Sequence, residues 1–166
     1  MNKKYIFILV GICVVSVLGI IVYNSRKTTS PEKLIKKLEN AINECDVEKL
    51  IECFPDFMRN EVSSLVSQEK MKEFYNNVIR DNNLVFQIIH ISEFDLDTIK
   101  LQEESINEKY EDGIKLADYQ LIQVQYHEDS EMPIYEIIKI GKEYYLYSGG
   151  YYPSPISYFL NKGDQL

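Results

Sequence analysis

The sequence predicts an α+β domain that is held at a membrane by one N-terminal helix. Three observations lead to this prediction. Residues 5–23 carry no charge, and most of residues 31–80 show apolar side chains at helical spacing. Several short segments after residue 84 are rich in β-branched and aromatic side chains, which is typical of strands. Helices that precede a mostly antiparallel sheet define the α+β class, so we expect N-terminal helices packed on a curved four-stranded sheet.

The uncharged segment from Tyr5 to Tyr23 has the length of a transmembrane helix. At 1.5 Å per residue it reaches roughly 28 Å, about the thickness of the hydrocarbon core of a bilayer. A cleaved signal peptide has a shorter apolar core and a small-x-small site after it, and neither is present. No small residue stands directly before Cys13, so a lipoprotein signal is not indicated. We therefore interpret residues 1–23 as an uncleaved signal anchor, with the two tyrosines at the membrane interfaces.

The orientation of this anchor rests on two opposing patterns. Lys3 and Lys4 precede the apolar segment, but more basic residues follow it within 26–37, so the positive-inside rule by count favours a cytoplasmic domain. A very short basic tail that leads directly into an apolar core is typical of export signals. We give this second pattern more weight and expect a cytoplasmic N-terminus and an extracytoplasmic domain. Gly11 and Gly19 are eight residues apart and are candidates for a helix-packing face, although they do not form a GxxxG motif.

The charge of the chain is distributed unevenly. Residues 1–30 hold four basic residues and no acid, and residues 31–166 hold 14 basic and 26 acidic residues, a net charge of −12. Such an acidic domain repels nucleic acid and anionic lipid, so no nucleic-acid partner is expected. Lysine, isoleucine and asparagine are abundant and alanine is rare, which suits an AT-rich genome such as that of a Gram-positive bacterium.

Local signals divide the remainder of the chain into a linker (24–30), a domain (31–150) and an aromatic tail (151–166). Ser30 and Pro31 predict the start of a helix over 31–45. Three further helices are expected. The first follows Asp46 and ends at Pro55, the second follows Asp56, and the third runs from Ser67 to about residue 80. Cys45 and Cys53 would be about 12 Å apart on one helix, too far for a disulfide, so two free, buried thiols are expected unless the chain breaks between them.

The period changes after residue 81. We expect a strand over 84–94, a helix over 97–110, and strands over 119–127, 134–140 and 143–148, the last two joined by a tight turn at Gly141-Lys142. Apolar residues alternate on both faces of the strands near 84–91 and 134–140. Since the helices are expected to cover one face only, the other face needs a cover. Residues 151–160 of the tail are one candidate, and a second subunit or a protein partner is another.

Two stretches, PEKLIKKLENAINECDVEKLIECF and YEIIKIGKEYYLYSGG, carry a resemblance to known folds. With them, residues 31–150 resemble the nuclear transport factor 2-like or cystatin-like folds, and more closely the small extracytoplasmic domains of Gram-positive bacteria. The resemblance implies a cone in which a curved sheet wraps a long helix. It transfers no site residues.

The sequence contains no motif for catalysis, a cofactor or a metal. It has no nucleophile elbow, glycine-rich phosphate loop or HExxH, and no second ligand is suitably spaced from either histidine. His90 follows the period of the strand near 84–88, which predicts a partly buried histidine. The tyrosines between 135 and 147 are interpreted as cross-strand packing residues. The candidates for a pocket or interface are Phe86, His90, Tyr135, Tyr145 and Tyr147.

Three functions are consistent with these patterns. The first is non-catalytic binding of a protein or small ligand at the cell envelope by a membrane-anchored domain. The second is a structural subunit of an envelope assembly, like the anchored domains of this fold in Gram-positive conjugation channels. The third is a pocket enzyme of the isomerase or dehydratase type, which needs a ligand-sized cavity that holds a buried carboxylate.

Overall fold

The computed structural model describes residues 27–79, 83–110, 113–126, 132–148 and 156. The predicted anchor, with Tyr5, Gly11, Gly19 and Tyr23, lies outside these ranges, as does most of the predicted tail. Among the described residues, no helix combines the length and apolar character needed to cross a membrane.

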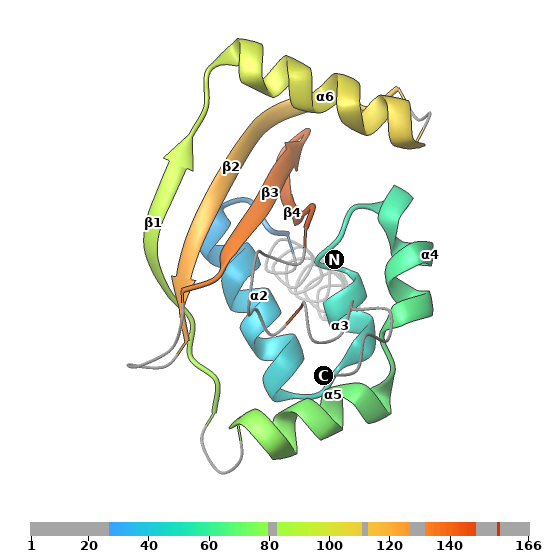
Figure 1. The fold of residues 1–166 in the computed structure, drawn as a ribbon, viewed down its shortest axis with the longest axis vertical. Helices are drawn as coiled ribbons and strands as arrows, with labels where there is room; N and C mark the ends of the chain where they lie inside the picture. The colour runs from blue at the N-terminus through green and yellow to red at the C-terminus, as the bar shows by residue number, and fades with distance from the viewer. Residues whose placement is uncertain (1–26, 80–82, 111–112, 127–131, 149–155, 157–166) are drawn as a thin grey trace, which may run out of the picture.

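The described chain forms an α+β domain with a four-stranded antiparallel sheet, as predicted. The strand order is β1-β2-β3-β4. In Figure 1 the sheet is curved, α6 lies across its upper end, and α3, α4 and α5 lie below and to the right. The elements in chain order are α2 (Pro31–Asn43), α3 (Val47–Ile51), α4 (Asp56–Leu65), α5 (Gln68–Phe74), a π-helical turn (Tyr75–Ile79), β1 (Gln87–Glu93), α6 (Leu96–Tyr110), β2 (Leu116–Gln125), β3 (Ile134–Ile140) and β4 (Glu143–Leu146).

Side-chain caps begin three of the four N-terminal helices. The side chains of Ser30, Asp46 and Ser67 each accept a hydrogen bond from the backbone N–H three residues later, which satisfies a helix-terminal donor. Helix α2 ends two residues before the predicted end because Cys45 adopts a positive φ of 51°. The chain does break between the two cysteines, but both thiols are free, and only Cys53 is fully buried.

One face of the sheet packs on the N-terminal helices and forms the main core. Leu34 and Leu38 of α2 have no exposed surface, and they share this cluster with Ile137 of β3 and Leu146 of β4. The buried side chains from the sheet are Ile122, Val124, Tyr135, Ile137, Tyr144 and Leu146. These side chains fill the space between α2 and the sheet.

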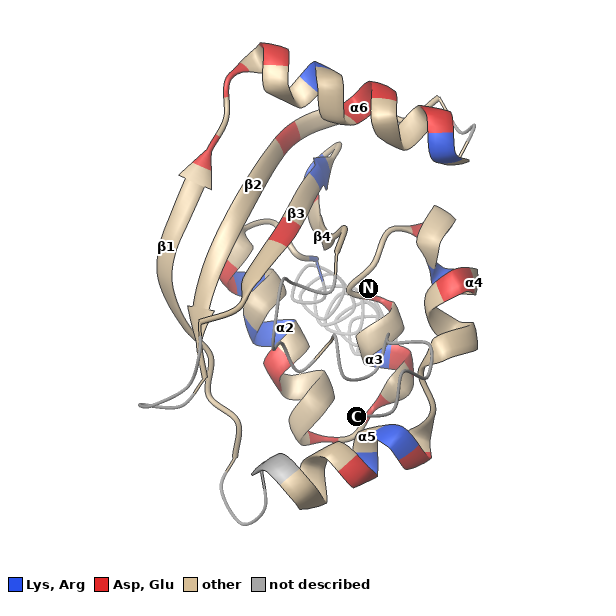
Figure 2. Cartoon of the chain, in the orientation of Figure 1, with Lys and Arg blue, Asp and Glu red and all other residues tan. Residues whose placement is uncertain are grey.

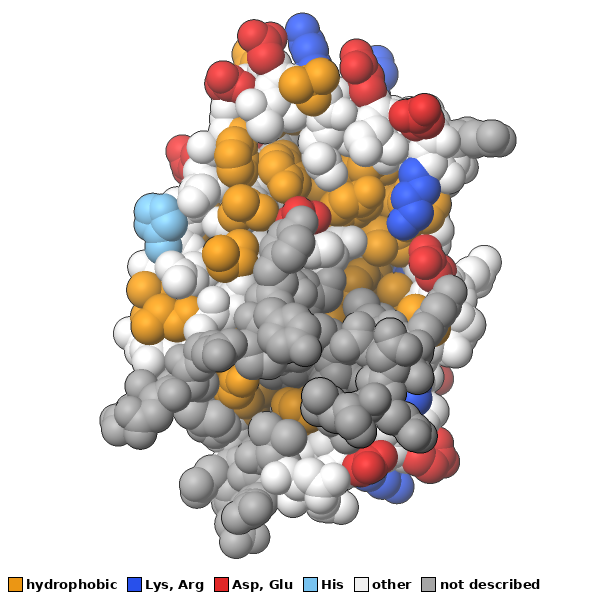
Figure 3. Space-filling model, viewed as in Figure 1, with side chains coloured by type: hydrophobic (Ala, Val, Ile, Leu, Met, Phe, Trp, Pro, Cys, Tyr) orange, Lys and Arg blue, Asp and Glu red, His pale blue; other side chains and the backbone are white. Residues whose placement is uncertain are grey.

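The second face of the sheet is partly covered by α6, contrary to the expectation that helices cover one face only. Ile99 and Ile106 of α6 form a separate buried cluster with Tyr119 of β2 and Ile138 of β3. The reason is topological: β1 and β2 are adjacent, and the connection that contains α6 passes over the face opposite α2. Figure 3 shows hydrophobic side chains gathered on the sheet beneath α6.

Polar side chains of α2 hold the segment that leads into β1. The Asn43 amide donates to the carbonyl of Leu84 and accepts from its N–H, both at 2.8 Å. The buried Glu39 carboxylate accepts from the backbone N–H of Phe86 at 2.8 Å and also pairs with Lys36. Residues 84–86 therefore bond to a helix, and β1 begins at Gln87, three residues later than predicted.

The same arrangement recurs where α6 meets the start of β2. Asn107 bonds to both the N–H and the carbonyl of Ile114, and Glu103 accepts from the N–H of Leu116 at 2.7 Å. The clamping residues stand in the pentapeptides ENAIN (39–43) and EESIN (103–107), each with a buried isoleucine before the asparagine. The structure thus contains two helix-to-strand clamps of the same pattern, which we call the Glu–Asn clamps.

The prediction that His90 is partly buried is wrong. The pairing of β1 with β2 shifts register between Ile88 and His90, which marks a β-bulge. The extra residue reverses the alternation, so Ile91 packs against the main core and His90 is exposed. Val85 and Ile89, expected on a sheet face that needs cover, are 63% and 43% exposed.

The C-terminal strands follow the prediction closely. β3 has the predicted bounds, and the turn at Gly141-Lys142 joins it to β4, with Gly141 at a φ of 60° that favours glycine. From the tail, Ile156 is fully buried in the main core with α2. This tail residue therefore packs on the α2 side of the sheet and not on the face that α6 partly covers.

Candidate functional site

The five residues predicted for a pocket or interface do not converge on one place. Phe86 and Tyr135 lie on the α2 side of the sheet, with ring centroids 6.3 Å apart, and Tyr135 is fully buried. Tyr145 packs against the α6 cluster on the other face, and Tyr147 packs against both clusters. His90 is exposed on the edge strand β1. Four of the five are packing residues of the two cores, and they surround no common cavity.

Tyr145 is the only one of the five that lines a described cavity. Its hydroxyl donates to the Glu143 carboxylate at 3.2 Å, and burial, followed by the charge of that carboxylate, raises the pKa of Tyr145 to about 12. Burial also raises the pKa of Tyr147 above its usual value. Both phenols therefore keep their protons at neutral pH, and that of Tyr145 acts as a hydrogen-bond donor.

The first described residues are fixed to the outer edge of β4. The Tyr144 N–H donates to the carbonyl of Thr28 at 2.7 Å, and the Thr28 hydroxyl donates to the carbonyl of Tyr144 at 2.7 Å. Thr28 is buried, and Lys27 approaches the Glu143 carboxylate at 3.8 Å. This contact places residues 27 and 28 of the predicted linker directly against the folded sheet.

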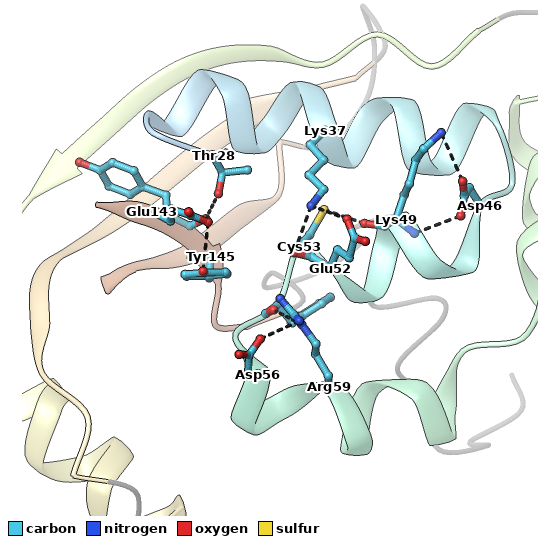
Figure 4. A network of polar contacts seen from close by, with 12 residues as sticks. Thr28, Lys37, Asp46, Lys49, Glu52, Cys53, Asp56, Arg59, Glu143 and Tyr145 are labelled. Atoms are coloured by element: carbon cyan, nitrogen blue, oxygen red, sulfur yellow. Dashed lines mark hydrogen bonds and ion pairs between the residues drawn. The ribbon is translucent and has the colours of Figure 1, made fainter. Parts of the chain in front are cut away.

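A charged cleft runs from this contact along α2 and α3, and we call it the α2 cleft. It has a volume of 660 Å³ and is lined by Lys27, Thr28, Lys33, Lys36, Lys37, Asn40, Glu44, Asp46, Glu48, Lys49 and Glu52. A neighbouring hollow of 460 Å³ shares four of these residues and adds Arg59, Glu143 and Tyr145. In Figure 4, Thr28, Glu143 and Tyr145 lie at one end of this region and Asp46 and Lys49 at the other, with Lys37 between them.

Ion pairs order the side chains in this region. Lys37 contacts the Glu52 carboxylate at 3.0 Å, and Arg59 contacts the Asp56 carboxylate at 2.6 Å. Lys49 pairs with the carboxylates of Glu44 and Asp46. The pKa of Asp46 is lowered, mainly because its carboxylate accepts a hydrogen bond from the backbone N–H of Lys49. The carboxylate therefore stays ionised at neutral pH.

The charge of the α2 cleft changes along its length. Four of its five lysines, at positions 27, 33, 36 and 37, lie at the end near Thr28, where Glu52 pairs with Lys37. The other three acids, at 44, 46 and 48, lie toward the far end with Lys49. In Figure 2, α2 and α3 carry both basic and acidic residues, and the charged residues of α6 are more often acidic than basic. The α2 cleft therefore presents a basic end next to the N-terminal contact.

The chemistry of the described side chains favours binding of charged groups. No cluster of three metal-binding side chains occurs in the described ranges. Cys53, next to the α2 cleft, is fully buried, its thiol contacts the carbonyl of Lys49 at 3.3 Å, and burial raises its pKa to about 12. Its thiol therefore keeps its proton and has low nucleophilicity at neutral pH.

A third cavity, of 440 Å³, is apolar and lies on the α6 side of the sheet. Pro55 and Phe57 from the start of α4 face Ile114, Ile140 and Tyr145 across it. The Phe57 ring also packs on Tyr110 of α6, with centroids 4.8 Å apart. This cavity forms where α4 meets the β3–β4 hairpin.

Sequence reasoning missed the α2 cleft. Its lysines entered the prediction only through membrane topology. Lys33, Lys36 and Lys37 fall with Asn40 on the helix face opposite Leu34 and Leu38, and this spacing was the available signal. The contact between Thr28 and Tyr144 joins residues 116 positions apart and has no local signature.

Comparisons of the chain with protein-family models, with curated proteins and with solved structures give no match. The fold and the α2 cleft alone therefore define its class: an α+β domain that presents a charged cleft beside its N-terminal segment.

Proposed function

We propose that this chain is a single-pass membrane protein whose extracytoplasmic domain binds a partner at the cell envelope without catalysing a reaction. The observation that carries the proposal is the short distance in sequence between the apolar segment and the first contact with the folded domain. An uncharged segment of transmembrane length ends at Tyr23, and Thr28 is already bonded to β4. A domain held this closely to its anchor works at the membrane surface.

A protein partner is favoured over a small ligand. The two charged hollows are lined by side chains that already pair with one another, and the core between α2 and the sheet is filled. In contrast, α6 exposes apolar side chains, with Leu96 75% and Leu101 67% exposed. Exposed apolar residues near a polar rim are typical of protein interfaces. A homodimer through the sheet face that α6 leaves open belongs to the same proposal.

For the fold, we propose that the domain belongs to the cone-like class of nuclear transport factor 2-like or cystatin-like domains. The curved antiparallel sheet that lies against the long helix α2 supports this assignment (Figure 1). In this chain α6 lies between β1 and β2.

Protease treatment of intact protoplasts tests the location. We expect added protease to digest the domain in intact cells, and the anchor fragment to stay in the membrane after an alkaline wash. Digestion only after lysis would show a cytoplasmic domain, and release of the chain by the alkaline wash would show that residues 5–23 do not span the membrane.

A further inference from the structure

The basic end of the α2 cleft lies next to the point where the chain leaves its proposed anchor. Tyr23 and Thr28 are five residues apart, and a fully extended chain covers at most about 18 Å over that distance. Thr28 is held on β4 by two hydrogen bonds of 2.7 Å. If the anchor spans the membrane as proposed, this end of the cleft must stay within about 18 Å of the end of the membrane helix.

Three of the four lysines at this end already pair with a carboxylate, and each can take a phosphate oxygen as a second partner. The Lys33 ammonium group donates to the hydroxyl of Thr29 at 3.1 Å. The side chain of Lys36 is 65% exposed, and its ammonium group pairs with the buried Glu39 carboxylate. Lys37 pairs with Glu52 and Lys27 with Glu143 across partly exposed contacts. Exposed ion pairs contribute little to stability, so these ammonium groups can share a phosphate oxygen without disturbing the fold.

The domain as a whole is acidic and repels anionic lipid, so only its basic end can approach an anionic surface. Residues 27–43, which contain this end, hold four lysines and two acids. Residues 31–166 carry a net charge of −12, and α6 bears four acids and two lysines. α6 packs on the sheet face opposite α2. An anionic membrane surface therefore attracts the α2 side and repels the α6 side, which gives a torque that selects one orientation.

We propose that the basic end of the α2 cleft, formed by Lys27, Lys33, Lys36 and Lys37, docks on anionic phospholipid headgroups of the membrane that holds the anchor. The headgroup phosphates take the place of solvent around these lysines. Docking directs α6, with the exposed Leu96 and Leu101, away from the bilayer and toward partners. This inference rests on the proposed anchoring and adds the surface and the lipid class to it.

Lysine labelling of the full chain tests the docking. The protein is reconstituted in nanodiscs of phosphatidylcholine, with or without phosphatidylglycerol, and amine modification is measured for each lysine by mass spectrometry. We expect phosphatidylglycerol to slow labelling of Lys33 and Lys36 about threefold or more, and high salt to reverse the effect. Lys70 of α5 and Lys100 of α6 serve as internal references and should label equally in both lipids.

Paired variants identify the lysines that matter. Lys33→Gln with Lys36→Gln should abolish the lipid-dependent protection of Lys37, while Lys70→Gln with Lys72→Gln should leave it unchanged. Equal labelling of Lys33 and Lys36 in both lipids overturns the docking. Equal protection by free inorganic phosphate with neutral nanodiscs also overturns it, because the cleft would then bind an anion and not a membrane surface. Loss of the chain from the nanodiscs after an alkaline wash would instead refute the anchoring.

Discussion

Asn43 satisfies two backbone groups of Leu84, a buried residue that precedes β1. Removing the amide leaves a buried N–H and carbonyl without these partners, so we expect Asn43→Ala to lower the free energy of unfolding by about 1–3 kcal/mol. Asn40→Ala is the matched control, because Asn40 is exposed on the same helix. Urea denaturation of both variants checks this, and equal losses would show that the first Glu–Asn clamp does not stabilise the fold.

Cys53 gives a pH-dependent prediction. Its pKa is about 12 in the folded protein and about 8.5 in an unfolded chain, so the folded state holds the proton more tightly. The stabilisation is fully present below about pH 8.5 and is lost as the pH rises toward 12. Between about pH 8 and about pH 10 the wild type should lose about 2 kcal/mol more than Cys53→Ala, which lacks this titration. Denaturation at both pH values measures the difference, and parallel losses would contradict it.

Local residue chemistry was predictable, and distant pairing was not. Ser30, Asp46 and Ser67 were recognised as helix starts because a cap acts over three residues. The Asn43 contact spans 41 residues, so no short pattern marks it. The recurrence of ENAIN and EESIN escaped notice because the two pentapeptides share only three identical positions.

At the scale of elements, α6 decides how the second sheet face is covered. Ile106 is fully buried in the α6 cluster, and Leu101 of the same helix is 67% exposed. We expect Ile106→Ala to lower the free energy of unfolding by about 2–5 kcal/mol and Leu101→Ala to change it by less than about 0.5 kcal/mol. Thermal unfolding of the two variants provides the comparison. A small effect of Ile106→Ala would mean that α6 does not pack on the sheet as described.

The bulge in β1 leads to a prediction about a deletion. Ile89 is the extra residue, and without it Ile88 and Ile91 still fall on the core face with His90 on the other. Deletion of Ile89 should therefore preserve the fold, whereas deletion of Ile91 removes a residue that packs on the core and reverses the face of Ser92 and Glu93. Amide exchange of β2 amides reports the outcome: protection should survive the first deletion and fall in the second.

Helices and strands could be told apart from the spacing of their apolar residues, but the residues at which they begin and end depended on tertiary contacts. The strand over 134–140 and the helix near 97–110 were correct because their patterns are local. The late start of β1 and the exposure of His90 follow from the Glu39 and Asn43 contacts and from the bulge. The α2 cleft needed the fold as well, since Thr28 meets Tyr144 and Lys27 meets Glu143 only after β4 has formed.

Over the whole molecule, the charge pattern and the fold explain each other. By the positive-inside rule, the number of lysines after the apolar segment argues against an extracytoplasmic domain. In the structure, however, those at 33, 36 and 37 line the α2 cleft beside the N-terminal contact. Under the proposed docking these lysines mark a surface that faces lipid, and their number no longer argues for a cytoplasmic location.

The tail residue Ile156 links the end of the chain to the core formed by its beginning. It is fully buried among the α2 side of the sheet and the N-terminal helices, so the main core contains contributions from both ends of the domain. We expect Ile156→Ala to lower the free energy of unfolding by about 2–5 kcal/mol, because it opens a cavity in a filled core. Leu96→Ala is the control, since Leu96 is 75% exposed. Thermal unfolding of the full chain decides the matter: if the two variants unfold at the same temperature, the tail is dispensable for the core, and the helices and the sheet alone close it.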